Sequence, residues 1–257
     1  MSTPQMLSVR NLSIEFGGVH AVDNVSFDVQ PGEVFAIIGP NGAGKSTIFN
    51  LISRFYEPTA GSIFYGEHDL LELPAHRIVR MGIGRTFQNI ELFEQATVLQ
   101  NLLVGRHRHM RSNPFREFLF LPGVKKDELV HRRKVEDVID LLEIARYRDQ
   151  RISDLPYGAR KNVELARALC AEPTLLLLDE PASGLNTEET DDVSFWLEDI
   201  KHDLGVTIVM VEHDMNLVAR VADRVLAINN GKVIAIGTPD EIRDNVEVQH
   251  AYLGAAA

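Results

Sequence analysis

The nine-residue stretch Gly39–Thr47 constrains this chain more than any other feature of its sequence. It fits the pattern G-x-x-x-x-G-K-[ST], in which glycines let the backbone approach phosphate oxygens closely. The apolar run Val34–Ile38 before it predicts a buried strand, and a helical pattern of apolar residues follows over 48–55. Strand, glycine-rich loop and helix in this order predict a nucleoside triphosphate site in an α/β fold.

Each position of this phosphate loop has an expected role. The loop amides and the N-terminus of the following helix attract phosphate, because both carry partial positive charge. Lys45 is expected to reach the β- and γ-phosphates, and the Ser46 hydroxyl is expected to face Mg²⁺. The residues expected to contact ATP here are Gly39, Pro40, Asn41, Gly42, Ala43, Gly44, Lys45, Ser46 and Thr47.

A second motif places two acids directly after the apolar run Leu175–Leu178. The carboxyl ends of parallel strands form the ligand edge of an α/β sheet, so Asp179 and Glu180 are expected to lie there. Asp179 is expected in the Mg²⁺ shell, and Glu180 is expected to polarise the attacking water. The pair predicts hydrolysis of the bound nucleotide; an acidic turn after a core strand is the alternative interpretation.

The remaining pattern suggests three sections. Residues 7–36 alternate apolar and polar side chains, which predicts antiparallel strands. Residues 85–165 predict mostly helices around a partly irregular insert at 106–126, whose aromatic residues form either a small core patch or an exposed contact surface. From Thr174 onward strands and helices alternate, ending in a hairpin around Asn230-Gly231. Asn186 and Glu189 predict a capping pair at the start of one of these helices.

Net charge, cysteine count and the length of the apolar runs exclude several classes of protein. The net charge of -11 argues against a nucleic-acid surface. Cys170 is the only cysteine, so no intrachain disulfide can form, which suits a reducing cytosol. The longest apolar runs, Thr174–Leu178 and Val206–Val211, are far shorter than a membrane span. Any work at a membrane therefore requires docking on another protein.

The segment Leu155–Arg160 precedes a predicted helix and then the acidic strand. It resembles the L-S-G-G-Q signature segment of the ATP-binding-cassette (ABC) ATPases. The resemblance implies that Tyr157, Gly158 and Ala159 contact the ATP held by an opposite subunit. Only the leading leucine and Gly158 match the pattern, whereas Pro156, Tyr157 and Ala159 depart from it.

Further matches follow in the order typical of that family. Phe16 resembles the aromatic residue that stacks on adenine. Gln88 resembles the glutamine that contacts Mg²⁺ and the attacking water and links the nucleotide to the transmembrane partner. His213 resembles the switch histidine that contacts the γ-phosphate, so the implied catalytic set is Glu180, His213 and Gln88. The D-loop is matched by Ser183, Gly184, Leu185 and Asn186, with asparagine where aspartate is usual.

The resemblance narrows to the larger of the two paired ATPases of branched-chain amino acid importers, in which the Tyr-Gly variant of the signature is usual. The stretches that carry it are Glu15–Val22, Gly82–Gln88, Tyr157-Gly158, the insert at 106–126 and Ala251–Gly254. It implies a single phosphate-loop NTPase domain of the ABC-ATPase type over residues 6–253. This domain has a RecA-like mixed core sheet and an N-terminal antiparallel β-subdomain (about 6–84 and 174–240), an inserted helical subdomain (about 85–172) and a tail at 241–257.

The same resemblance implies the cofactors ATP and Mg²⁺ and a nucleotide-sandwich dimer, either with a second copy or with a sister ATPase. It also implies a transmembrane permease, indirectly a substrate-binding protein, no nucleic acid, and a peripheral position on the cytoplasmic face of the membrane.

Three alternatives stay open. The importer could carry urea, amides or other amino acids, because an ATPase subunit does not touch the substrate. A soluble cassette ATPase acting on DNA or ribosomes would show two cassettes, a coiled-coil insert or a basic face. A nucleotide-binding regulatory module without turnover is suggested by Pro156, Ala159 and Asn186.

Overall fold

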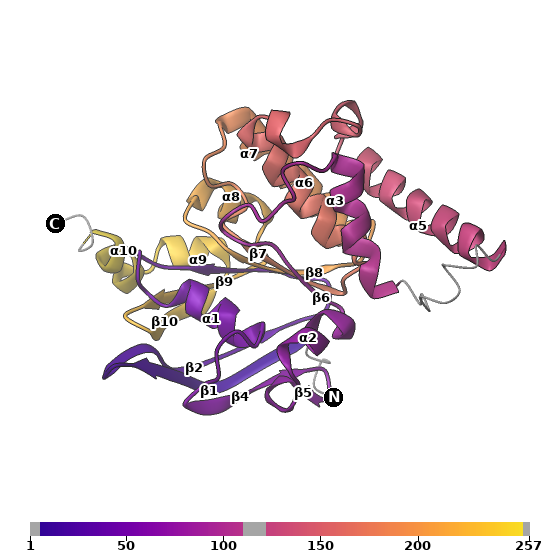
Figure 1. Cartoon of the computed structure of the whole chain (residues 1–257). Coiled ribbons are helices and arrows are strands. Elements are labelled where there is room, and N and C mark those ends of the chain that lie inside the picture. The colour runs from indigo at the N-terminus through magenta and orange to yellow at the C-terminus, as the bar shows by residue number, and fades with distance from the viewer. Residues whose placement is uncertain (1–5, 110–121, 254–257) are drawn as a thin grey trace. The chain divides into compact units, whose positions relative to one another are not determined.

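The computed structural model describes residues 6–109 and 122–253, and the chain forms two compact units (Figure 1). The first unit joins Met1–Ile83 to Thr174–Ala257, and the second is the continuous segment Gly84–Pro173.

An antiparallel sheet of the first unit has the strand order β2-β1-β4-β5. Its strands are β1 (Leu7–Phe16), β2 (Val19–Val29), β4 (Ala60–Tyr65) and β5 (His68–Asp69). Buried side chains alternate with more exposed ones along much of β1, as the period of two in the sequence predicts. The register pairs Leu7 with Val29 and Val9 with Phe27, which places the apolar side chains of both strands on one face.

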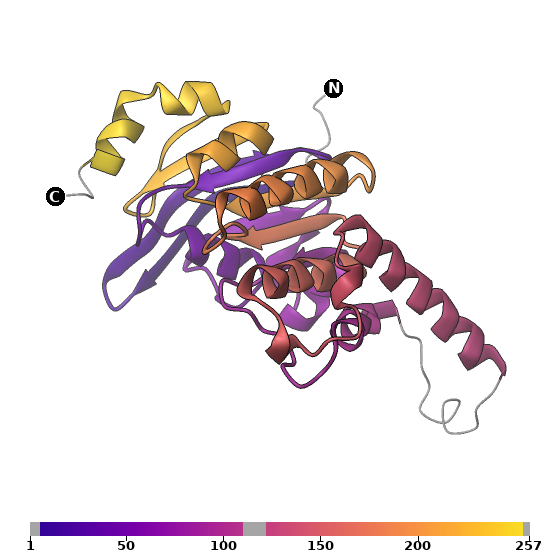
Figure 2. The ribbon, with the colours of Figure 1, turned by 90° about the horizontal axis from the view of Figure 1, so that it is seen from above.

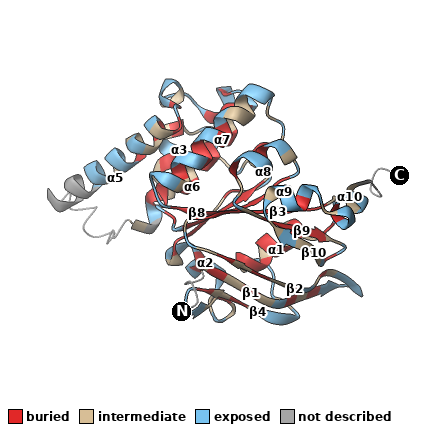
Figure 3. Cartoon of the chain, turned by 180° about the vertical axis from the view of Figure 1, so that it is seen from behind, coloured by how far each residue is buried: buried red, intermediate tan, exposed pale blue. Residues whose placement is uncertain are grey.

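A second sheet has the order β10-β9-β3-β8-β7-β6. Its strands are β3 (Val34–Ile38), β6 (Ile83–Arg85), β7 (Leu175–Asp179), β8 (Thr207–Val211), β9 (Arg224–Asn229) and β10 (Lys232–Gly237). Strand β3 pairs in parallel with β8 and β9, so the prediction that antiparallel strands continue to residue 36 is wrong for residues 34–36. The whole of β3 is buried, as is typical of a parallel strand covered on both faces (Figure 3).

The predicted hairpin is confirmed. Strands β9 and β10 are antiparallel, and Asn230 and Gly231 both have positive φ, at 47° and 76°. Two adjacent positive φ values are what a tight turn between twisted strands requires.

The helices of the first unit are α1 (Lys45–Ile52), α2 (Ala75–Ile78), α7 (Thr187–His202), α8 (Met215–Val221), α9 (Pro239–Arg243) and α10 (Val246–Leu253), with 3-10 turns η1 (Leu70–Glu72) and η2 (Val79–Met81). The predicted helix over 48–55 ends early. Arg54 takes a φ of 61°, which no helix continues through, and Phe55 is exposed.

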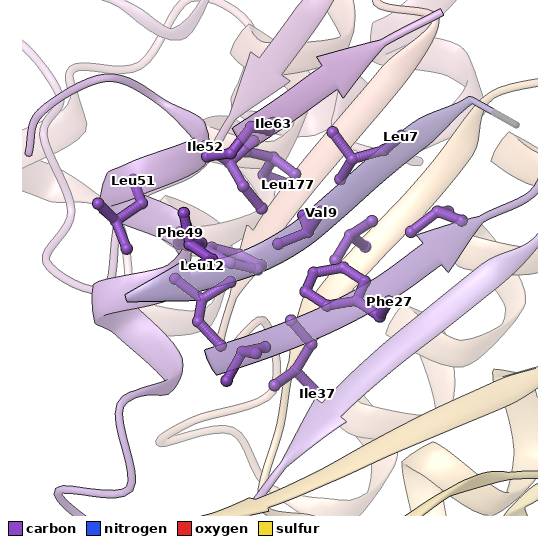
Figure 4. Close-up of a cluster of buried hydrophobic side chains, with 14 of the residues drawn as sticks. Leu7, Val9, Leu12, Phe27, Ile37, Phe49, Leu51, Ile52, Ile63 and Leu177 are labelled. Carbon is purple, nitrogen blue, oxygen red and sulfur yellow. The ribbon is translucent and has the colours of Figure 1, made fainter. Parts of the chain in front are cut away.

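One hydrophobic core holds the phosphate loop's flanking elements together (Figure 4). Phe49 and Ile52 of α1 pack with Val9 and Ile63 of the antiparallel sheet and with Leu177 of β7. Each such side chain contributes about 1.5–3 kcal/mol when fully buried. The residues after the loop are therefore anchored firmly.

The second unit is mainly helical. It contains α3 (Val98–Gly105), α5 (Pro122–Leu141) and α6 (Tyr157–Cys170), with 3-10 turns η3 (Arg106–His109), η4 (Ala145–Tyr147) and η5 (Ile152–Asp154). The three α-helices pack against one another (Figure 2). Cys170 is buried, and burial raises the pKa of its thiol to about 12.

Part of the predicted insert at 106–126 falls at residues 110–121, and its aromatic patch lies outside the described residues. The structure differs from an irregular insert at its end, because α5 already begins at Pro122. Across the described ranges, no helix combines the length and the apolar run that crossing a bilayer would need.

Candidate nucleotide site

Two glycines shape the loop between β3 and α1. Gly39 has a φ of 155°, and a Cβ there would lie 2.2 Å from the carbonyl oxygen of Ile228 in β9. Gly44 has a φ of 103°, and its Cβ would lie 2.3 Å from the carbonyl oxygen of Ala21 in β2. Backbone packs against the loop at both points, so only glycine fits, and the loop holds the concave shape that suits a phosphate.

Lys45 turns its ammonium group back over the loop. Its Nζ donates to the carbonyl oxygens of Gly39 at 2.8 Å and of Pro40 at 3.0 Å. Burial lowers the pKa of Lys45, and the negative charges of Glu180 and Asp179 oppose that shift. The loop lysine and the two predicted acids therefore lie within electrostatic reach of one another.

The N-terminus of α1 is available to an anion. Its N-cap is Gly44, which offers no side-chain acceptor, and its first turn contains no acidic residue. The first amides of a helix need acceptors from outside the helix, and a phosphate meets that need.

Asp179 is the last residue of β7 and Glu180 follows it, so both lie at the carboxyl end of the strand, as predicted. Asp179 is only 4% exposed and pairs with Val211 of β8 in the parallel register. The Glu180 amide donates to the Val211 carbonyl oxygen at 2.9 Å, while Glu180 itself takes a φ of 52°. A non-glycine residue in this conformation stores strain of the kind that clusters at functional sites.

The oxygen donors present suit Mg²⁺. Ser46 lies in the first turn of α1 and Asp179 at the end of β7. Among the residues that the structure describes, no three or more His, Cys, Asp or Glu side chains form a metal cluster. The hydroxyl of Ser46 and the carboxylate of Asp179 offer oxygen ligands, the kind that Mg²⁺ takes together with phosphate oxygens and water.

Sequence reasoning missed Glu212, which is fully buried next to His213. Its Oε1 accepts from the amide of Ala182 at 2.9 Å, and its Oε2 accepts from the amides of His213 at 2.9 Å and Asp214 at 3.2 Å. The signal was present as an acid directly after the apolar run 206–211, the same pattern that identified Asp179.

His213 has an exposed side chain in the loop between β8 and α8. Its Nδ1 lies 3.8 Å from Oε2 of Glu212. Asp214 caps α8 by accepting from the amides of Asn216 at 2.8 Å and Leu217 at 3.3 Å. The loop is thus fixed on both sides of the histidine.

The predicted D-loop, residues 183–186, connects β7 to α7. The Ser183 amide donates to the Glu180 carbonyl oxygen at 3.1 Å, so the first residue of the predicted D-loop is bonded to Glu180, the expected catalytic residue. Asn186 forms the predicted capping box with Glu189 at the start of α7.

Phe16 lies at the end of β1 and is 47% exposed. It meets Tyr56 edge to face at a centroid distance of 5.3 Å. Sequence reasoning named only Phe16; the structure adds Tyr56 as a second half-exposed ring beside it.

In the second unit, α6 begins at Tyr157 with Pro156 as N-cap and without a side-chain cap. Arg160 holds the segment by donating to the carbonyl oxygens of Leu155 at 2.9 Å and Ser153 at 2.8 Å. Tyr157 is half exposed, whereas Gly158 and Ala159 are buried. The amides of this helix start are therefore free of side-chain competition, as an anion site requires.

Gln88 lies near that helix start. A pocket of about 220 Å³ is lined by Gln88, Asn89, Ile90, Leu92, Glu94, Ile152, Tyr157 and Arg160. Buried Glu164 of α6 accepts from the amide of Phe87 at 3.3 Å, next to Gln88. Burial raises the pKa of Glu164, and the Phe87 amide and Arg167 oppose that shift. Within this unit the segment that contains Gln88 therefore bonds to α6, the helix that the signature segment begins.

Helix α10 reaches the phosphate loop from the C-terminal end of the chain (Figure 1). The Tyr252 hydroxyl is buried and lies close to the Gly39 backbone. Burial raises the pKa of Tyr252, and the Gly39 backbone opposes that shift. Sequence reasoning gave this residue no role at the site.

Comparison with known proteins decides the family. The ABC transporter family model matches residues 22–183, more than half of the chain. The chain belongs to the ABC transporter ATP-binding family. A second model, for branched-chain amino acid ATP-binding cassette transporters, matches residues 232–257, which include α9, α10 and Tyr252.

Two curated relatives and one solved structure of this family are similar over nearly their whole length. The chain is 39% identical to the high-affinity branched-chain amino acid transport ATP-binding protein LivG of Escherichia coli K12 and 40% identical to BraF of Pseudomonas aeruginosa, covering 100% of each chain. The ADP conformation of MJ1267, an ATP-binding cassette of an ABC transporter, aligns with a TM-score of 0.84 and 29% identity, covering 97% of this chain and 99% of the other. These likenesses confirm the predicted fold and family.

Within this family the asparagine of the D-loop has a structural explanation. Asn186 acts as the N-cap of α7, a position where asparagine and aspartate stabilise a helix about equally. Its replacement of the usual aspartate therefore leaves the local fold intact.

Proposed function

We propose that this chain hydrolyses ATP to power an importer of branched-chain amino acids. The observation that carries the proposal is the phosphate loop, in which Gly39 and Gly44 pack against backbone and Lys45 folds back over the loop carbonyl oxygens. Identity of 39–40% to LivG and BraF over the full chain supports the transported class.

In the proposed mechanism each group acts at a stated position. Lys45 leaves the loop carbonyl oxygens and binds the β- and γ-phosphates, and the amides at the start of α1 donate hydrogen bonds to the phosphate oxygens. Ser46 and Asp179 would hold Mg²⁺, which would neutralise phosphate charge. Glu180 orients the attacking water and takes its proton, and His213 donates to the γ-phosphate. Phe16, with Tyr56 at its edge, packs on the adenine ring.

Half of each site comes from another subunit in this proposal. Cassettes of the family work as dimers together with permease subunits. The uncapped start of α6 at Tyr157 and Gly158 would meet the γ-phosphate bound by the opposite subunit. The segment around Gln88 would pass the resulting motion to a permease at the membrane.

The experiment reconstitutes the full chain with its permease, with and without a sister ATPase, in proteoliposomes and measures phosphate release and uptake of labelled leucine. The wild type is expected to do both. Lys45→Ala is expected to lose nucleotide binding, and Glu180→Gln to keep binding while losing turnover by at least about 100-fold.

Excess valine or isoleucine should compete with leucine, and urea or acetamide should not. Competition by urea or acetamide alone would favour the related importers. Binding without phosphate release by the wild type would favour a regulatory module.

A further inference from the structure

Glu212 lies where the carboxyl ends of three neighbouring strands meet. Its amide donates to the carbonyl oxygen of Ile37 in β3 at 3.3 Å, just before the phosphate loop. Its side chain accepts from Ala182, after β7, and from His213 and Asp214, after β8. One fully buried residue thus bonds to three segments: the end of β3 before the phosphate loop, the segment after Glu180, and the loop that carries His213.

The two carboxylate oxygens serve different loops. Oε1 bonds to the segment that leads from Glu180 into the D-loop, and Oε2 bonds to the loop that carries His213. Backbone amides are donors only, so both oxygens must remain acceptors for both loops to stay satisfied. An unsatisfied amide in a fully buried place is costly, which couples the positions of the two loops.

We propose that Glu212 is a positioning residue that locks the Glu180–D-loop segment to the His213 loop, so that the two move as one body around the γ-phosphate. The proposal rests on the proposed roles of Glu180 and His213. It assigns Glu212 no contact with nucleotide: it acts only through the two loops.

The first test measures amide hydrogen exchange in the full chain. Glu212→Gln has nearly the same shape, but its amide group turns a donor toward one of the two loops. Exchange at Ala182 and at His213 and Asp214 is expected to rise together, by at least about tenfold. Glu212→Asp keeps the charge but is too short to span both loops, so it should not rescue. A rise at one loop alone would overturn the proposal.

The second test is a double-mutant cycle on ATP hydrolysis. Glu212→Gln is expected to lower kcat by about tenfold or more while ATP affinity changes by less than about twofold. Added to His213→Ala, it should slow turnover by clearly less than it does in the wild type, because one of the two catalytic side chains that it positions is already gone. Fully additive losses would show a merely structural role and overturn the proposal.

Glu33→Gln is the matched control. Glu33 is a buried carboxylate of the same unit that accepts from the Gln30 amide at 2.6 Å and pairs with Arg224 at 3.1 Å. Its substitution should lower stability and leave exchange at Ala182 and His213 unchanged. If His213→Ala hydrolyses ATP at the wild-type rate, the role of His213 fails, and hydrogen exchange still decides whether Glu212 joins the loops.

Discussion

Gly39 and Gly42 occupy the same loop with positive φ, yet they face different surroundings. A Cβ on Gly39 would lie 2.2 Å from a backbone oxygen of β9, a strand paired with β10 on one side and β3 on the other. A Cβ on Gly42 would meet nothing within 4 Å, so only its φ of 80° resists substitution. The motif alone treats the two glycines alike, whereas the structure separates a packing constraint from a conformational one.

Gly39→Ala is therefore expected to destabilise the fold by more than about 3 kcal/mol, because the β9 backbone cannot move away. Gly42→Ala is the control and should cost only the left-handed conformation, about 1–2 kcal/mol. Denaturant unfolding of both variants checks this. Equal losses for the two would contradict the assigned clash at Ile228.

At the scale of elements, helix α7 depends on its N-cap residue, Asn186. The Asn186 side chain accepts from the Glu189 amide, and the Glu189 carboxylate accepts from the Asn186 amide, each at 3.0 Å. Asn186→Ala removes one of these bonds and should lower the free energy of unfolding by about 1 kcal/mol.

Asn186→Asp is the matched variant and should stay within about 0.5 kcal/mol of the wild type, because both side chains cap equally well. Thermal unfolding compares the two. An Asn186→Asp variant as unstable as Asn186→Ala would contradict this, because it would show that an acceptor oxygen at the N-cap does not suffice to stabilise α7.

The elements best predicted from sequence were those with a local physical signal. The hairpin at Asn230-Gly231 and the capping box at Asn186 each depend on adjacent residues, and both are confirmed. The end of α1 was misplaced because apolar spacing continued to Phe55, while the conformation of Arg54 had already ended the helix.

Contacts of the site between residues far apart in the sequence could not be predicted from local patterns. Glu212 bonds to Ala182, 30 positions away, and Tyr252 reaches Gly39 from the last helix described. Neither spacing nor composition reveals such a contact until the strands are in register. The catalytic roles of Glu180, Gln88 and His213 stay predictions, because geometry alone does not test them.

At the scale of the whole molecule, a composite site predicts that two different defects can complement each other. Lys45→Ala removes the phosphate-loop half. Tyr157→Asp places a negative charge at the start of α6, where it suits the helix but repels the opposite subunit's γ-phosphate. Each variant alone should hydrolyse almost no ATP. A mixed dimer keeps one intact site, built from the loop of one chain and the α6 start of the other.

An equimolar mixture of the two full chains should therefore recover about a quarter of the wild-type rate, since half of random dimers are mixed and each holds one of two sites. Phosphate release at equal total protein measures this. Tyr157→Asn, which adds no charge, controls for the loss of the ring and should retain most activity. An active wild type with an inactive mixture would contradict a site shared between two copies of this chain.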